Sequence, residues 1–121
     1  MSENQKPKQY DLEDRTFQFA KDVREFIRKL PKPVANIDDV HQLVRSSGSV
    51  GANYIEANEA LSKKDFVHRA KICRKEAKES RYWLRLIYIE KDETLEQNRS
   101  RLIQESTELM NIFGAIIHKS E

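Results

Sequence analysis

The sequence holds only one cysteine, three glycines and three prolines in 121 residues. One cysteine excludes an intramolecular disulfide and a zinc site built from several cysteines. Few glycines and prolines leave little material for the tight turns of an all-β fold. No apolar run approaches the about 20 residues of a membrane span, and the first ten residues are polar, without the apolar core of a signal peptide. We therefore expect a soluble, cytosolic, helical protein.

Charge and length favour a single helical domain. Charged residues make up 35% of the chain, and 121 residues suffice for one hydrophobic core. The net charge of +2 is close to neutral, so the overall charge indicates nothing about nucleic acid. The polar residues 1–10 predict a disordered N-terminal arm, and residues 11–121 predict one domain.

Apolar residues at helical spacing predict a first helix over Leu12–Leu30. Pro31 and Pro33 end it, because proline cannot continue the hydrogen-bond ladder. The apolar positions of this helix are Phe17, Ala20, Val23, Phe26, Ile27 and Leu30. A second helix is expected to begin at the aspartate at position 38 or 39 and to run to about residue 60.

Two further helices complete the pattern. Ser62, three residues before Asp65, is close to a capping box and starts a third helix that ends near Ile89. Its seam steps by four and three through Phe66, Ala70, Cys73, Ala77, Ser80, Leu84 and Ile87. A fourth helix, ending near Ile117, repeats this pattern with Leu95, Leu102, Ser106, Leu109, Phe113 and Ile116. Four helices with short connections predict an all-α fold, an antiparallel up-and-down four-helix bundle.

The stretch Gln42–Asn58, QLVRSSGSVGANYIEAN, is unusually rich in small residues for a helix. Gly48 and Gly51 each cost a helix about 1 kcal/mol relative to alanine. Close approach of another helix backbone would offset this cost, so we expect a tight helix contact here.

A line of polar residues follows one face of the same helix. Its members lie at i, i+4, i+8 and i+11, and they are Arg45, Ser49, Asn53 and Glu56. Either this line is a solvated face, or it forms a polar network buried between helices, which the small residues around it favour. Glu79 of the third helix is the expected partner of Arg45, in a buried ion pair that fixes the register of the two helices.

Charge is segregated on the third helix. Between Ser62 and Lys91 the sequence has ten basic and four acidic residues, a charge of about +6, against about −4 for the rest of the chain. On a helical projection six cations gather on one side, which we call the basic flank: Lys64, Lys71, Arg74, Lys78, Arg81 and Arg85. Three interpretations fit: a solvated face with i,i+4 ion pairs, a contact with the negative surface of a neighbouring protomer, or a phosphate-binding stripe for RNA or DNA. Tyr82 beside the basic flank is placed to stack on a base, which is weak support for the third interpretation.

Apolar residues outside the seam of the third helix need a separate explanation. Ile72, Trp83 and Leu86 lie on the same side as Glu76 and Glu79. A wide core accounts for them, and so does a contact between subunits, where tryptophan is often an anchor. We favour the oligomer interface and assign to it Ile72, Glu76, Trp83 and Leu86.

Residues for catalysis or metal binding are sparse. His41 and His68 each follow an aspartate as D-x-x-H, but aspartate in a first helical turn is expected as a cap or dipole partner. His118 shares no site with them, and the inward carboxylates of a di-iron bundle are missing. Cys73 lies on the core seam, the place of a buried apolar residue. Without a glycine-rich phosphate loop or a nucleophile elbow, we expect no enzyme, no metal, no cofactor and no small-molecule substrate.

The segments VRSSGSVGANYIEA and KKDFVHRAKICRKEAKESRYWLRLI resemble the four-helix-bundle family first met as proteins encoded by intervening sequences within bacterial 23S ribosomal RNA genes. The resemblance covers about residues 15–117. Up to the end of the second helix the matching residues are Leu30, Pro31, Gln42, Arg45, Ser46, Ser49, Val50, Asn53 and Glu56. On the third helix they are Ser62, Phe66, Ala77, Glu79 and Leu84. This chain has Ala57 and Asn58 where many relatives carry a glycine, which leaves the loop geometry open.

The resemblance implies an antiparallel four-helix protomer that assembles into a homopentameric ring. It also implies kinship with the accessory protein of diversity-generating retroelements, a basic pentamer that engages a reverse transcriptase and nucleic acid. It implies no established activity. We therefore expect a non-enzymatic oligomer that contacts RNA, or a protein that handles nucleic acids, through the basic flank. The alternative is a purely structural protein–protein scaffold without affinity for nucleic acid.

Overall fold

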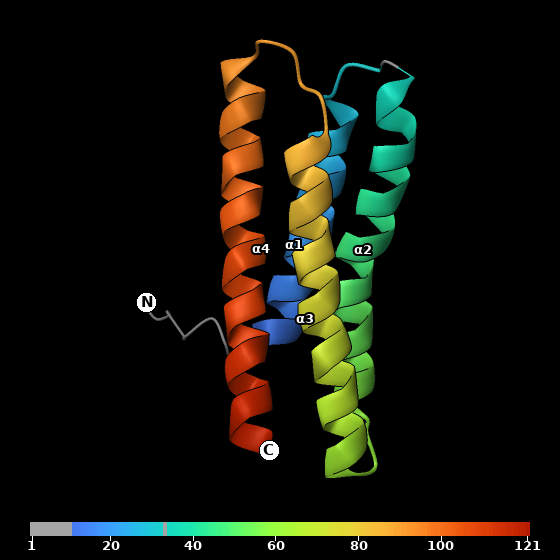
Figure 1. Ribbon diagram of the computed structural model, residues 1–121, viewed down its shortest axis with the longest axis vertical. Coiled ribbons are helices and arrows are strands. Elements are labelled where there is room, and N and C mark those ends of the chain that lie inside the picture. The colour runs from blue at the N-terminus through green and yellow to red at the C-terminus, as the bar shows by residue number, and fades with distance from the viewer. Residues whose placement is uncertain (1–10, 33) are drawn as a thin grey trace.

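The computed structural model describes residues 11–32 and 34–121, and across these residues the chain forms helices and no strand. The elements are α1 (Leu12–Arg28), α2 (Ala35–Asn58), α3 (Lys63–Leu86) and α4 (Glu93–Ser120). They run alternately up and down and are joined by short connections (Figure 1). The prediction of an all-α, antiparallel up-and-down four-helix bundle is therefore confirmed. The predicted N-terminal arm, residues 1–10, lies outside the described residues.

The four helices occupy the corners of a square. α1 contacts α2 and α4, and α3 contacts the same two helices, so α1 and α3 lie at opposite corners. α3 is thus held on both sides, by α2 and by α4, and only its outward face reaches solvent (Figure 1). This arrangement decides which side chains of α3 a partner can touch.

Side-chain caps start α3 and α4. The Ser62 hydroxyl accepts a hydrogen bond from the backbone N–H three residues later at 3.0 Å, which confirms the predicted start of the third helix. The Asp92 carboxylate accepts the equivalent bond at 3.0 Å. α2 has no such cap and begins at Ala35, so its predicted start at position 38 or 39 is wrong. Asp38 lies within the first turn, where its charge favours the helix dipole without being the cap.

α3 ends at Leu86, three residues before its predicted end at Ile89. Ile87 has an extended backbone with φ −60° and ψ 135°, and Glu90 has a positive φ of 56°. Ile87 and Ile89 stay buried, with 1% and 3% of their surface exposed. The apolar period continues past the helix because both isoleucines fill the core from an extended segment. The other helix ends lie within three residues of their predicted positions.

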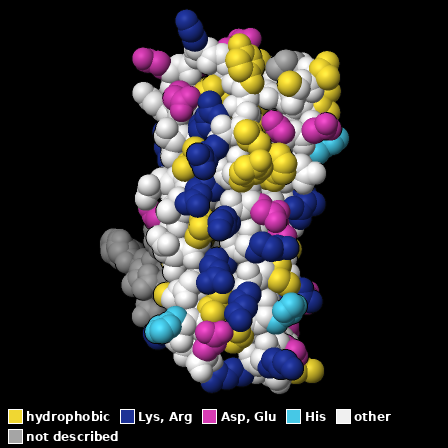
Figure 2. Space-filling model, in the orientation of Figure 1, with side chains coloured by type: hydrophobic (Ala, Val, Ile, Leu, Met, Phe, Trp, Pro, Cys, Tyr) yellow, Lys and Arg dark blue, Asp and Glu magenta, His cyan; other side chains and the backbone are white. Residues whose placement is uncertain are grey.

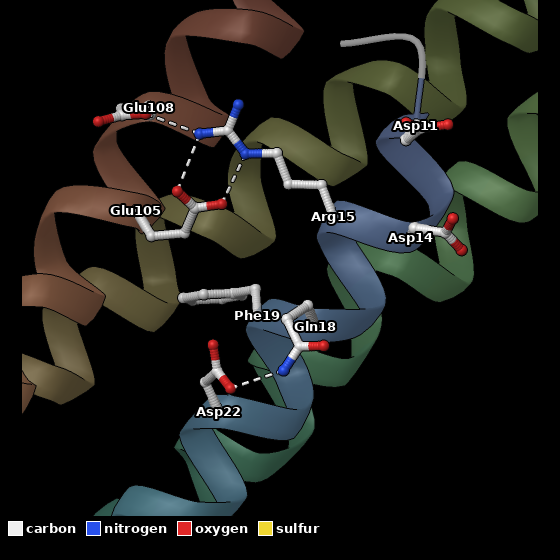
Figure 3. Close-up of a pocket in the computed structure, with 8 residues that line it drawn as sticks. All are labelled: Asp11, Asp14, Arg15, Gln18, Phe19, Asp22, Glu105 and Glu108. Atoms are coloured by element: carbon white, nitrogen blue, oxygen red, sulfur yellow. Dashed lines mark hydrogen bonds and ion pairs between the residues drawn. The ribbon is translucent and has the colours of Figure 1, made fainter. Parts of the chain in front are cut away.

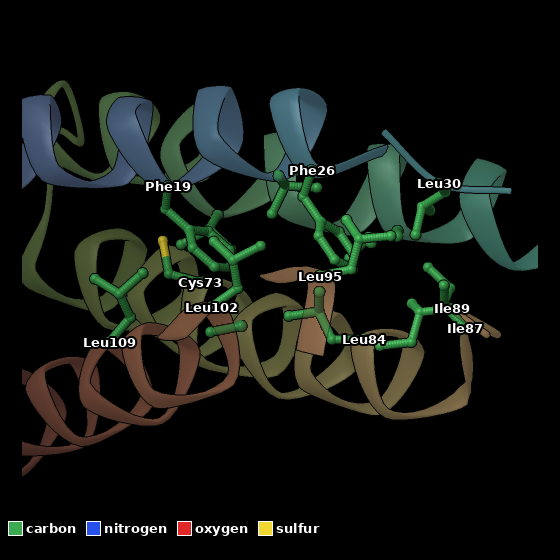
Figure 4. Close-up of a cluster of buried hydrophobic side chains, with 14 of the residues drawn as sticks. Phe19, Phe26, Leu30, Cys73, Leu84, Ile87, Ile89, Leu95, Leu102 and Leu109 are labelled. Atoms are coloured by element: carbon green, nitrogen blue, oxygen red, sulfur yellow. The ribbon is translucent and has the colours of Figure 1, made fainter. Parts of the chain in front are cut away.

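Large apolar side chains from all four helices fill the core. Figure 4 shows Phe19 and Phe26 of α1 in the same cluster as Leu95 and Leu102 of α4. The predicted seam of α3 is half-buried at Phe66 and buried at Ala70, Cys73, Ala77, Ser80, Leu84 and Ile87. The seam of α4 is buried at Leu95, Leu102, Ser106, Leu109, Phe113 and, in place of Ile116, Ile117.

The core face of α1 differs from the predicted one at Phe17. This side chain is 65% exposed, whereas Phe19 is 1% exposed. The buried positions step by four and three through Leu12, Thr16, Phe19, Val23, Phe26 and Leu30. The expectation that Phe17 faces the core is therefore wrong, because the polar Thr16 occupies a core position and hides the seam in the sequence.

Candidate nucleic-acid interface

The basic flank forms a surface along the whole of α3. Figure 2 shows Lys and Arg side chains in a column that follows this helix. Arg81 is half-buried and donates a hydrogen bond to the Thr107 hydroxyl of α4 at 3.3 Å, so the column lies on the side of α3 nearest α4. The other five members are exposed: Lys64, Lys71, Arg74, Lys78 and Arg85.

Four of these cations follow one another every seven residues: Lys64, Lys71, Lys78 and Arg85. At about 1.5 Å per residue, neighbours in this series lie about 10.5 Å apart along the helix axis. Seven residues make nearly two full turns, which keeps all four on one side of the helix. The result is a straight line of positive charge about 32 Å long.

Few carboxylates approach the basic flank. Lys71 Nζ lies 3.2 Å from Glu121 Oε2, and these side chains are 50% and 55% exposed. Solvent and salt screen such a pair, so it contributes less than about 1 kcal/mol. Among the described residues, the other exposed members of the basic flank form no ion pair. No carboxylate of residues 11–32 or 34–121 neutralises these four charges.

Arg99 of α4 closes the C-terminal end of α3. Its Nη1 donates to the backbone carbonyl oxygens of Leu84 at 3.0 Å, Arg85 at 3.4 Å and Ile87 at 2.7 Å. The helix dipole favours a cation at this end. The Arg99 side chain is only 15% exposed, so it fixes the helix end beside Arg85 instead of adding an open charge. Sequence reasoning missed this contact, because only the packing of α4 on α3 creates it.

An apolar and aromatic patch borders the basic flank. Figure 2 shows hydrophobic side chains on the upper half of α3, beside the column of cations. Tyr82 is 54% exposed and Leu86 49% exposed, whereas Trp83 is half-buried and packs against the core. The rings of Tyr82 and Trp83 meet edge to face, with centroids 5.0 Å apart and an interplanar angle of 78°. Trp83 therefore connects an exposed tyrosine to the rigid interior.

Asn36 of α2 holds the segment that follows α3. Its amide nitrogen donates to the Tyr88 carbonyl oxygen at 2.8 Å, and its amide oxygen accepts from the Tyr88 N–H at 3.0 Å. Asn36 is 4% exposed, whereas Tyr88 is 54% exposed. A buried amide that satisfies both backbone groups of one residue gives the connection a defined conformation. No local signal in the sequence indicates this role, because the two residues are 52 positions apart.

The polar line of α2 meets α3 at the surface. Arg45 Nη2 donates to Glu79 Oε1 at 2.9 Å, so the structure brings the expected pair together. The two side chains are 50% and 40% exposed, and the prediction that this pair is buried is wrong. The buried carboxylate is Glu76, 7% exposed, whose Oε1 lies 3.4 Å from Arg45 Nη1. Glu76 and Glu79 lie about one turn apart on the side of α3 nearest α2, so the sequence pattern does not distinguish them.

Ser49, Asn53 and Glu56 do not extend this pair into a buried network. The Asn53 amide donates to the Ser49 carbonyl oxygen at 2.9 Å and accepts from Arg69 Nη1 of α3 at 2.8 Å. Ser49 and Asn53 are half-buried, and Glu56 is exposed. The line is therefore a partly solvated edge between α2 and α3.

The fully buried polar contact between α2 and α3 joins two serines. The Ser80 hydroxyl lies 3.0 Å from the Ser46 hydroxyl and 2.9 Å from the Glu76 carbonyl oxygen. Both serines are 0% exposed. Their small side chains let the two helices approach closely, and each hydroxyl has a partner, so the contact satisfies its own polar groups.

The residues assigned to an oligomer interface are largely covered by the chain itself. Glu76 is buried, and Ile72 and Trp83 are half-buried. Packing against the core accounts for Trp83, as the alternative of a wide core predicted. Only Leu86 is exposed, at 49%. An interface at these four residues stays a prediction.

A second apolar surface lies between α1 and α2. It is a groove of about 440 Å³. Its most exposed apolar side chains are Phe17 and Ile55, at 65% and 51%. Four small residues also line it, Ala20, Gly48, Gly51 and Ala52, and the rest of its lining is polar or charged: Glu13, Thr16, Lys21 and Arg24. Because α1 and α3 lie at opposite corners, this groove faces away from the basic flank.

Arg15 of α1 binds two glutamates of α4. Its Nε and Nη2 donate to Glu105 at 2.7 and 2.8 Å, and Nη2 also donates to Glu108 at 2.7 Å (Figure 3). The bond to Glu105, above all, raises the pKa of Arg15, and hydrogen bonds from Gln104 and Arg15 lower the pKa of Glu108. Three more carboxylates line the surrounding groove of about 580 Å³: Asp11, Asp14 and Asp22. The Arg15 guanidinium already binds two carboxylates of the chain, so it is not open to an external anion. The site therefore joins α1 to α4 and does not form an anion pocket.

The described residues offer little to catalysis. No group of three or more His, Cys, Asp or Glu side chains among them is placed to hold a metal ion. His41, His68 and His118 are exposed and lie on three different helices. Cys73 is buried, and burial raises the pKa of its thiol to about 12, which keeps it protonated. Within the same part of the chain, every helix is too short or too polar to cross a bilayer.

The fold and the basic flank define an all-α four-helix-bundle protein with a candidate phosphate-binding surface. Over residues 8–115 its sequence matches the family described as 23S rRNA-intervening sequence protein, and the chain belongs to this family. The crystal structure of a protein of unknown function from the S23 ribosomal protein family of Bacteroides thetaiotaomicron is similar, with a TM-score of 0.69 and 30% sequence identity over 87% of this chain and 96% of that one. No curated protein matches the sequence. Kinship with the accessory protein of retroelements stays a prediction.

Proposed function

We propose that this protein binds RNA through the basic flank of α3 and acts as a non-enzymatic, oligomeric adaptor. The observation that carries the proposal is the set of five exposed cations of the basic flank, of which Lys71 alone pairs with a carboxylate among the described residues. Each phosphate that such a line neutralises releases condensed counterions, which favours binding at low salt. Membership of this family does not indicate a particular activity, because the similar crystal structure is of a protein of unknown function.

The positions of the acidic residues of α3 argue against a merely solvated face. That interpretation requires acidic partners three or four residues from the cations of the basic flank. The acidic residues of α3 lie instead toward α2, where Glu76 and Glu79 face Arg45. A contact with a neighbouring protomer's negative surface would compete with RNA for the same cations, and the oligomer mass of a variant without these cations distinguishes the two interpretations.

The groove between α1 and α2 supports the oligomeric part of the proposal. Exposed phenylalanine and isoleucine side chains at the rim of a groove are typical of protein contacts. Subunits that meet there would leave the basic flank of every subunit open, so an oligomer would repeat the line of cations. The family resemblance implies five copies in such an oligomer. This groove also favours the second candidate function, a protein–protein scaffold without affinity for RNA.

Fluorescence anisotropy of a labelled, structured RNA tests the proposal. We expect saturable binding whose affinity falls log-linearly from about 50 to about 300 mM salt. The triple variant Lys71→Glu, Lys78→Glu and Arg85→Glu should reduce the slope of log K against log salt by at least about 2, because three phosphate contacts are removed. Light scattering should give the same oligomer mass for this variant as for the unaltered protein.

A matched control carries the same change of charge elsewhere. Lys32→Glu, Arg101→Glu and Lys119→Glu alter three exposed cations outside α3. This control should keep most of the affinity, since it leaves the basic flank intact. No binding by the unaltered protein at the lowest salt would overturn the RNA proposal. Loss of the oligomer in the α3 variant would assign the basic flank to assembly.

A further inference from the structure

We infer that the basic flank takes single-stranded RNA or DNA, and that Tyr82 stacks on one unpaired base of the strand. This inference rests on the proposed function and adds to it the form of the nucleic acid. It follows from three features of α3: the place of Tyr82 among the cations, the support of its ring, and the packing of the helix between two others.

Tyr82 lies directly beside the line of cations. It follows Lys78 by four residues and precedes Arg85 by three, and residues at these spacings are neighbours on one helical face. The three side chains are exposed, Tyr82 at 54%. A nucleotide whose phosphates contact Lys78 and Arg85 would bring its base within reach of the tyrosine ring. Aromatic rings between cations are the arrangement by which proteins hold single strands without regard to sequence.

The ring of Tyr82 is supported before any ligand arrives. Its edge-to-face contact with Trp83 has a centroid distance of 5.0 Å, and Trp83 packs against the core. A side chain that is already restrained loses less conformational entropy when it stacks. A free surface tyrosine would not have this advantage.

The packing of α3 argues against a duplex. α2 and α4 hold this helix on both sides, so it cannot enter the major groove of DNA as an isolated recognition helix does. The major groove of duplex RNA is too deep and narrow for side chains to read. In either duplex the faces of the bases are covered by their stacked neighbours, so Tyr82 would find no open base face on which to stack.

The straight course of the cations also suits a flexible strand. The line extends about 32 Å along one helix. The backbones of a rigid duplex wind around their axis and meet a straight line only where they cross it. A single strand can follow the line and place successive phosphates against it. The stacking of its bases is tolerant of sequence, since every base has a π face.

The test compares three labelled probes of one sequence: the single strand, the same strand annealed to its complement, and the same strand with abasic residues. All three are titrated by anisotropy, in RNA and in DNA form. We expect the single strand to bind tightest in at least one form. Tyr82→Ala should weaken its binding by about fivefold or more, and the unaltered protein should bind the abasic strand about as weakly.

Two variants and the salt dependence of binding distinguish the contribution of base stacking to affinity from the contribution of charge. Tyr82→Phe keeps the ring and should bind within about twofold of the unaltered protein. Ile37→Ala removes an apolar side chain of similar exposure from α2, outside the basic flank and its border, and should leave affinity unchanged. Tyr82→Ala should keep the slope of log K against log salt, because it removes no phosphate contact. Circular dichroism verifies that each variant is folded.

The outcomes separate this inference from the proposed function. Equal binding of the single strand, duplex and abasic probes, with no effect of Tyr82→Ala, would overturn the stacking inference and leave the basic flank as an RNA surface. Absence of binding to every probe would overturn both. Loss of affinity with Tyr82→Ala for the single strand alone supports the inference.

Discussion

Gly51 of α2 lies directly against Thr16 of α1. A Cβ added to this glycine would come within 2.9 Å of Thr16 Oγ1 and 3.3 Å of Thr16 Cβ. Thr16 is 0% exposed, and its hydroxyl donates to the Leu12 carbonyl oxygen at 2.9 Å, so it cannot easily move away. The close helix contact expected from the small residues of α2 is confirmed at this position. Gly48 has a different neighbour, the flexible guanidinium of Arg24 at 3.2 Å.

Gly51→Ala should therefore destabilise the protein. Alanine is the better helix former by about 1 kcal/mol, but overpacking against Thr16 costs about 1–3 kcal/mol and outweighs that gain. Gly114→Ala is the matched control, since nothing lies within 4 Å of its added Cβ, and it should stabilise by up to about 1 kcal/mol. Urea unfolding measures both. An equal increase in stability from the two substitutions would contradict the close contact between Gly51 and Thr16.

Arg99→Ala should loosen the C-terminal end of α3. The substitution removes donors from three backbone carbonyl oxygens and a cation from the helix end, a loss of about 1–3 kcal/mol. The control is Arg101→Ala, an exposed arginine two positions later, with an expected change below about 0.5 kcal/mol. Hydrogen exchange should show faster opening of the last turn of α3 in the first variant. Similar exchange in both would refute the capping role.

The helices and their seams follow from the sequence because they depend on local spacing. Ala70, Cys73, Ala77, Ser80 and Leu84 sit at steps of three and four, and burying this stripe requires a partner helix whatever its identity. The start of α3 can also be predicted from the sequence, because a serine cap acts within one helical turn.

The contacts that complete the site are not local, and the sequence does not indicate them. Asn36 reaches Tyr88 across 52 positions, and Arg99 reaches the carbonyl oxygens of a different helix. Thr16 breaks the apolar pattern of α1 because it faces a glycine of α2, a relationship visible only when both helices are in place. The distinction between Glu76, which is buried, and Glu79, which is half solvated, likewise arises from how α2 and α3 pack.

Arg45→Ala should cost more stability than Glu79→Ala. Arg45 faces the buried carboxylate of Glu76, whose Oε1 accepts no hydrogen bond among the described residues. Removing the arginine leaves this carboxylate with Lys75, a 60% exposed side chain whose Nζ lies 3.6 Å from Glu76 Oε2 and which compensates the buried charge only in part. We expect a loss of about 1–3 kcal/mol for Arg45→Ala and less than about 1 kcal/mol for Glu79→Ala.

Glu76→Gln should rescue the arginine variant. It removes the charge that Arg45 compensates, so the double variant Arg45→Ala with Glu76→Gln should unfold at a higher urea concentration than Arg45→Ala alone. A double-mutant cycle gives the coupling energy of the two residues. Strict additivity would mean that the two side chains do not interact.

Acid should weaken the contact of α1 with α4 through Glu108. The hydrogen bonds from Gln104 and Arg15 lower the pKa of this carboxyl in the folded chain. A lowered pKa stabilises the fold above the ordinary value of 4.5, and this contribution disappears as the pH falls below that value. The urea midpoint of the unaltered protein should therefore drop more steeply below that pH than that of Glu108→Gln. If the urea midpoints of the two proteins fell in parallel with decreasing pH, a role of the Glu108 charge in stability would be excluded.

Cys73 should resist alkylation until the bundle opens. The thiol is 0% exposed, and burial raises its pKa to about 12, so at pH 8 only about one molecule in ten thousand would carry the thiolate. Iodoacetamide should therefore label the urea-unfolded protein at the rate of a free cysteine and the native protein far more slowly. Because α3 packs on both α2 and α4, exposure of this thiol requires much of the bundle to separate. Gly51→Ala should therefore speed the labelling of the native state about tenfold for every 1.4 kcal/mol of stability that it loses. Rapid labelling of the unaltered native protein would show that the centre of α3 opens locally, independently of the rest of the core.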